Sequence, residues 1–133
     1  MKTLVVSLVG ALSLGAATAS LAQQAGQERF DLDGVSVVVT AHAFLTEEEL
    51  MTLRLVGQNR DALALFVPEG DGFAALAVAP DEGFVRAGMP VDSASALSGL
   101  PDLDAARAAA LEACNSARSG GASCAVVLEV APR

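Results

Sequence analysis

The sequence predicts an α+β fold: a single antiparallel sheet with two helices packed on one face, in the order β-α-β-β-β-α-β. Residues 35–45 carry apolar side chains at every odd position, which is typical of a strand with one buried face. Residues 46–49, Thr-Glu-Glu-Glu, have the spacing of a helix capping box. Residues 102–130 combine an alanine-rich helix, a Gly-Gly break and an apolar strand. A ferredoxin-like sandwich with one extra hairpin strand fits this order.

The first 22 residues have the pattern of a secretory signal peptide. Lys2 provides the basic start, residues 4–14 form the apolar stretch, and Ser20-Leu21-Ala22 places small residues where the peptidase cleaves. The apolar stretch is shorter than the roughly 20 residues that a membrane-spanning helix needs. We therefore expect cleavage after Ala22 and no stable membrane anchor afterwards.

Cleavage at that point leaves 111 residues, enough for one modest hydrophobic core. We place a single domain at residues 35–133, after a flexible N-terminal arm at residues 23–34. The intact chain has a net charge of −8, and the loss of Lys2 leaves sixteen acids against seven arginines, or −9. Such a surface repels nucleic acid and anionic lipid, so we expect neither as a partner.

The only two cysteines are Cys114 and Cys124. In an exported protein they predict a disulfide, because the periplasm is oxidising, and their spacing is not that of a C-x-x-C redox pair. The sequence therefore indicates a periplasmic or secreted protein. A loop of this length closed by a disulfide contributes roughly 3 kcal/mol to stability.

The first helix is predicted after Thr46, which with Glu49 completes the capping box, while Leu45 and Leu50 occupy the hydrophobic staple positions. Gly57 is placed to end this helix. Next, two apolar segments at residues 62–67 and 73–79 flank a turn cluster at residues 68–72, which predicts a β-hairpin.

Pro80-Asp81-Glu82-Gly83 suits a tight turn, and a short strand is expected at residues 84–87. Residues 88–101 form a long connection rich in proline, glycine and serine, which is typical of a mobile loop or a binding loop. Asp102 is expected to cap the second helix, whose small apolar side chains share one face. An apolar strand at residues 124–130 ends the domain.

The segments AFLTEEELMTLRLVGQ (43–58), AALAVAPDEGF (74–84), ARAAALEAC (106–114) and CAVV (124–127) resemble a family of small exported alphaproteobacterial proteins. Members of that family often carry the label 5-aminolevulic acid synthase. The second half is also similar to a domain of unknown function in secreted bacterial proteins. The resemblance implies a strand, turn, strand, helix, strand order with a helix-to-strand cystine, and it brings no catalytic residues.

The label itself implies chemistry that this chain cannot perform. Genuine 5-aminolevulinate synthases hold pyridoxal phosphate as a Schiff base on a lysine. The only lysine here is Lys2, inside the predicted signal peptide. We therefore reject synthase activity and predict no cofactor.

His42, the only histidine, is the one weak catalytic candidate. Ser36 lies on the same predicted strand face and acids are abundant, yet no G-x-S-x-G or other nucleophile motif supports a triad. A metal site built from His42 and residues 47–49 lacks the usual ligand spacing. Asp31 to Gly34 begins like a calcium loop, but the required distal glutamate is absent.

The remaining motifs all serve folding, and the chain has no tryptophan or tyrosine to stack on a sugar or a base. We therefore expect a non-enzymatic domain that binds a protein or a small ligand. Two alternatives stay open: a small hydrolase or lyase that uses His42 with nearby acids, and a secreted inhibitor that presents residues 88–101 as a loop.

Overall fold

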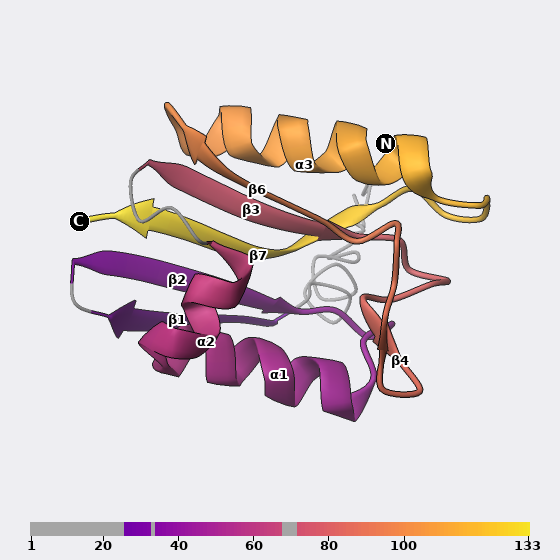
Figure 1. Ribbon diagram of the computed structural model, residues 1–133, viewed down its shortest axis with the longest axis horizontal. Coiled ribbons are helices and arrows are strands. Elements are labelled where there is room, and N and C mark those ends of the chain that lie inside the picture. Colours follow the sequence, from indigo (N-terminus) through magenta and orange to yellow (C-terminus); the bar gives the residue numbers. More distant parts are fainter. Residues whose placement is uncertain (1–25, 33, 68–71) are drawn as a thin grey trace, which may run out of the picture.

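The computed structural model describes residues 26–32, 34–67 and 72–133, and the predicted signal peptide lies outside this part. One five-stranded antiparallel sheet forms the centre of the molecule, with the strand order β1-β2-β7-β3-β6 (Figure 1). Its strands are β1 (Gly26–Leu32), β2 (Val35–Ala41), β3 (Phe73–Val78), β6 (Ser95–Leu100) and β7 (Ala125–Pro132). The predicted α+β class with one main antiparallel sheet is confirmed.

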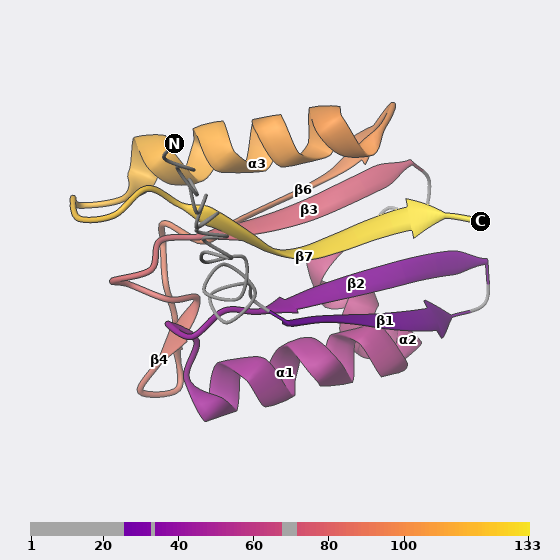
Figure 2. The same ribbon diagram turned by 180° about the vertical axis from the view of Figure 1, so that it is seen from behind.

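Three helices pack on this sheet, and they cover both of its faces rather than one (Figures 1 and 2). They are α1 (Glu47–Gln58), α2 (Arg60–Phe66) and α3 (Leu103–Ala117). Strand β3 is apolar at every position, so it is buried on both sides. Ala74, Leu76 and Val78 face α1 and α2, whereas Ala75 and Ala77 face α3. This arrangement differs from the expected ferredoxin-like sandwich with both helices on one face.

Strand β1 occupies most of the segment that was expected to be a flexible arm. It pairs along its whole length with β2, from Gly26 opposite Ala41 to Leu32 opposite Val35. Phe30 and Leu32 pack against the core under α1, and this contact holds the otherwise polar strand on the domain. The domain therefore includes residues 26–32. Strand β2 itself ends at Ala41 and not at residue 45, because a turn follows in which Leu45 N–H donates to His42 O.

The predicted capping box of α1 is confirmed: Glu49 N–H donates to Thr46 Oγ1, and Thr46 N–H donates to Glu49 Oε1. Gly57 does not end the helix, which continues to Gln58. Instead Gly57 is buried against the ring of Phe30, and a Cβ at this position would collide with that ring. The glycine therefore allows a close approach between α1 and β1.

The segment expected as a strand at residues 62–67 is the second helix, α2. Asn59 caps it, because its side-chain oxygen accepts from the N–H groups of Asp61 and Ala62. A short apolar run fits a strand and a buried helical turn equally well, so the pattern alone did not separate them. Strand β3 pairs instead with β6 and β7, not with residues 62–67.

The connection expected at residues 88–101 is largely ordered into strands. The short strands β4 (Val85–Arg86) and β5 (Met89–Pro90) form a separate hairpin, whose turn residues Ala87 and Gly88 have φ values of +53° and +74°. Edge strand β6 follows and pairs with β3. The predicted strand at residues 84–87 thus exists only as β4 and does not join the main sheet.

Helix α3, its Asp102 cap and the following strand agree with the prediction. Asp102 Oδ1 accepts from Ala105 N–H at 2.7 Å, and Ala106, Ala110 and Cys114 are fully buried against β3. Cys114 and Cys124 form the predicted disulfide. Within residues 26–32, 34–67 and 72–133, no helix is long and apolar enough to cross a membrane.

Candidate functional site

His42 joins the end of β2 to β7. Its Nε2 lies 3.0 Å from the carbonyl oxygen of Val126, to which it donates, and its ring stacks on Phe44 with the ring centroids 4.9 Å apart. The β2–β7 ladder ends at the pair Val39–Leu128, so the imidazole satisfies a carbonyl beyond the last paired residues. The side chain therefore has a structural explanation.

The residues that a catalytic role for His42 would need are not brought to it. Ser36 lies six positions earlier, near the start of β2, about 20 Å away along an extended backbone. Glu49 is turned toward a different loop, where it bonds Phe84 and Val85. Among the described residues, His42 has no carboxylate or hydroxyl partner, and no cluster of three His, Cys, Asp or Glu side chains could hold a metal ion.

Glu49 is a fully buried carboxylate that organises the loop after β3. Besides closing the capping box, its Oε2 accepts from Phe84 N–H at 2.6 Å and from Val85 N–H at 3.0 Å, while Arg86 lies 3.2 Å from Oε1. Burial by itself raises the pKa of Glu49, but the backbone donors Thr46, Val85 and Phe84 and the charge of Arg86 together lower the pKa below its ordinary value. The carboxylate is fully occupied in holding α1 to β4.

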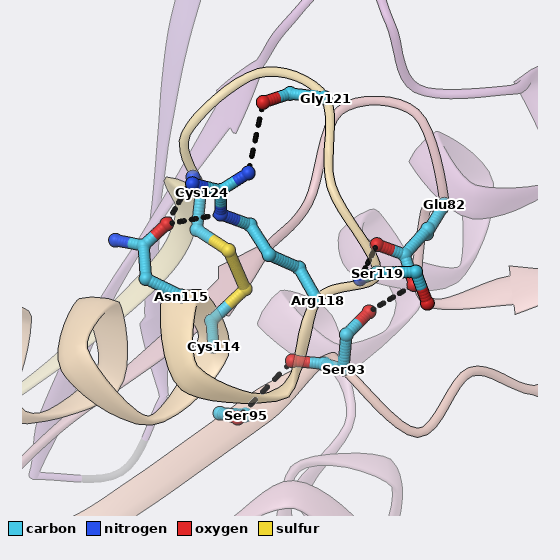
Figure 3. Close-up of a disulfide and its surroundings, with 9 residues drawn as sticks. All are labelled: Glu82, Ser93, Ser95, Cys114, Asn115, Arg118, Ser119, Gly121 and Cys124. Atoms are coloured by element: carbon cyan, nitrogen blue, oxygen red, sulfur yellow. Dashed lines mark hydrogen bonds between the residues drawn. A yellow bond between two sulfur atoms is a disulfide. The ribbon is translucent and has the colours of Figure 1, made fainter.

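The cystine and the Gly-rich turn form a second structural network (Figure 3). Arg118 donates to Gly121 O at 2.8 Å and to Asn115 Oδ1 at 3.0 Å, and the same Asn115 oxygen accepts from Cys124 N–H. Glu82 accepts from Ser119 N–H on one carboxylate oxygen and from the Ser93 hydroxyl on the other. The predicted turn at residues 80–83 thus holds the loop between α3 and β7.

A polar cleft of about 500 Å³ lies over the part of the sheet that α3 leaves uncovered. Strands β1, β2 and β7 supply its floor, and the start of α3 forms one wall. The lining side chains are Gln27, Arg29, Asp31, Ser36, Val38, Leu103, Arg107, Glu129, Ala131, Pro132 and Arg133. The opposite face of the same strands is apolar and packs under α1. Because side chains alternate along a strand, Val37 and Val39 of β2 lie on that apolar face, and Ser36 and Val38 lie on the face of the cleft.

Two of the three arginines in the cleft are already paired. Arg107 donates to both oxygens of Glu129, at 2.8 and 2.9 Å, and these hydrogen bonds raise the pKa of Arg107. Arg133 lies 3.7 Å from Asp31. Arg29 makes no hydrogen bond or ion pair to any described residue, and the buried hydroxyl of Ser36 likewise has no protein partner there. Among the described residues of the cleft, Arg29 is therefore the one cation without a partner, and the Ser36 Oγ lies buried below the cleft surface.

Sequence reasoning missed this cleft because it assigned residues 26–32 to a flexible arm. The alternation of Arg29 and Asp31 with Phe30 and Leu32 was a usable indication of a strand with one polar face. Without β1 as a strand, however, nothing placed Arg29 beside β2.

A second hollow, about 730 Å³, lies over the outer surface of α1. All of its described lining residues belong to that one helix, including the exposed Met51 and Leu55. The convex side of a single helix cannot surround a ligand, so we do not regard this surface as the site.

Comparisons of the chain with protein families, with curated proteins and with solved structures gave no match. The family resemblance of these segments therefore stays an expectation.

Proposed function

We propose that this protein is an exported, non-enzymatic domain that binds a small ligand in the cleft over β1, β2 and β7. One observation carries the proposal: a polar cleft on the half of a sheet face that α3 leaves uncovered, in which Arg29 has no partner among the described residues. Its volume lies within the range of roughly 300 to 1,000 Å³ that is usual for small-molecule sites.

Export is supported by the leader-like first 22 residues and by the disulfide between Cys114 and Cys124. The hydrolase or lyase alternative gains nothing from the surroundings of His42, which bonds a backbone carbonyl. The inhibitor alternative required residues 88–101 to form a loop, but strands β5 and β6 occupy much of this segment.

The proposal can be tested by screening a small-molecule fragment library by NMR against the protein purified from an exporting host. We expect the amide shifts caused by fragment binding to gather on β1, β2 and the start of α3. A screen whose hits map only to the outer surface of α1, or that gives no hits, contradicts the proposal.

A blocking variant strengthens this test. Val38→Trp places a large side chain on the floor of the cleft and should abolish fragment binding, whereas Leu55→Trp on the exposed face of α1 should leave it unchanged. Circular dichroism of both variants checks that they are folded.

A further inference from the structure

We propose that the ligand of this cleft is a small organic acid, whose carboxylate is bound by Arg29 and whose apolar part lies on Val38 and Leu103. The inference rests on the proposed function and adds the chemical class of the ligand. It depends on which charged groups of the cleft are free and on where the strand register places them.

The strand register puts Arg29 beside the apolar part of the cleft. Arg29 lies directly opposite Val38 in the β1–β2 ladder, on the same face of the sheet. Side chains directly opposite each other have Cβ atoms about 4.5–5.5 Å apart. A carboxylate bound by the guanidinium can therefore place its apolar part on Val38.

The lining side chains alone carry an excess of one positive charge, which Asp104 offsets from outside the lining because it also pairs with Arg107. Arg29, Arg107 and Arg133 face Asp31 and Glu129, in a chain whose net charge is −8. The bidentate pair with Arg107 neutralises Glu129, and Arg133 partly neutralises Asp31. The long-range field of the protein repels anions, so binding has to come from these short-range contacts.

A carboxylate suits this site better than a compact oxyanion does. The planar guanidinium of Arg29 matches the two oxygens of a carboxylate in a bidentate contact. Val38 and Leu103 add an apolar surface next to the polar groups, which an inorganic anion would leave uncovered. The expected ligand is therefore amphipathic, with one acidic end.

The test is a calorimetric and NMR titration of the purified protein with hexanoate, with the neutral hexanamide and with inorganic phosphate. We expect hexanoate to bind in the cleft at least about tenfold more tightly than hexanamide, because only the acid can pair with Arg29. Phosphate should bind more weakly than hexanoate. Hexanamide binding as tightly as hexanoate, or phosphate binding more tightly, overturns the proposal.

Variants assign the effect to particular residues. Arg29→Gln should lower hexanoate affinity about tenfold. Arg54→Gln is the matched control, because it removes the same charge from α1 on the opposite face of the sheet. Asp31→Asn should tighten hexanoate binding, since it removes a negative charge two positions from Arg29 on the same face of β1. Equal losses in Arg29→Gln and Arg54→Gln contradict the assignment.

The outcomes separate this inference from the proposed function. If neutral fragments bind in the cleft and hexanoate does not, the ligand class is wrong while the binding function stands. If neither acids nor neutral fragments bind there, both proposals fail.

Discussion

Among single residues, Glu49 has the greatest structural influence that we can assign. It is the only fully buried carboxylate in the part of the chain that the structure describes, and it links the start of α1 to the loop before β4. Its capping role follows from sequence spacing alone. Its second role, as acceptor for Phe84 and Val85, joins residues that are 35 and 36 positions apart.

Replacing Glu49 by glutamine should lower the free energy of unfolding by about 2 kcal/mol, because the charge-assisted bonds to backbone donors and to Arg86 are lost. Chemical denaturation at neutral pH measures this change. Glu48→Gln is the matched control, since Glu48 is exposed and neighbours Glu49 in the same helical turn. Equal destabilisation by the two substitutions would refute the role assigned to Glu49.

The contribution of Glu49 should also depend on pH. Because its folded pKa is lowered from 4.5, the contribution is fully present above the unfolded pKa and is lost as pH falls through the folded pKa. The stability difference between wild type and Glu49→Gln should therefore be constant near neutral pH and shrink below about pH 4.5. A difference that grows on acidification would show that the pKa is raised instead.

Gly83→Ala should destabilise the protein more than Gly88→Ala does. Both glycines have similar positive φ values, +71° and +74°, so both alanines carry a backbone cost of about 1–2 kcal/mol. A Cβ at Gly83 would in addition collide with Glu49 and Arg86, whereas Gly88 has open space. Thermal unfolding of the two variants compares them, and equal melting temperatures would argue against the close packing around Glu49.

At the scale of elements, α3 and β7 form a unit closed by the cystine. Alanines at positions 106 and 110 let α3 lie close on the alanines of β3, and the disulfide joins the last turn of α3 to the start of β7. Here the sequence pattern and the structure agree, because the cap, the glycine break and the cysteines all act over short separations.

Replacing both Cys114 and Cys124 by alanine should cost about 3 kcal/mol, because the denatured chain gains the freedom of an open loop. Urea unfolding with and without reductant measures this. Reductant should destabilise the wild type and leave the double variant unchanged. Mass spectrometry of the unreduced protein should detect the linked peptide, and free thiols there would contradict the disulfide.

At the scale of the whole molecule, the uneven cover of the sheet creates the candidate site. One face lies under α1 and α2, while α3 covers only the β7, β3 and β6 side of the other face (Figures 1 and 2). The open half over β1, β2 and β7 is lined by polar residues. Its existence depends on β1, which extends the sheet beyond the reach of α3.

Export concerns the whole chain and remains a prediction. Expression with its own leader in a bacterial host should yield a periplasmic protein that begins at Gln23. Intact-mass measurement of the recovered protein checks the cleavage site. A Lys2→Glu variant should be exported less efficiently, because it removes the positive charge of the leader. Retention of the full chain in the cytoplasm would contradict the proposal of an exported protein.

Local chemistry by itself determined the α1 capping box, the helix and strand around the cystine, and the disulfide pairing. These features are readable because their partners lie within about ten residues of each other. Only the tertiary structure decided that residues 62–66 form a helix, that residues 26–32 join the sheet, and that the helices cover both faces. The secondary structure of a short apolar or polar run depends on residues that are distant in the sequence. Phe30 of β1, for example, packs against Gly57 of α1. The cleft depends on the same long-range pairings, so the sequence pattern did not reveal it.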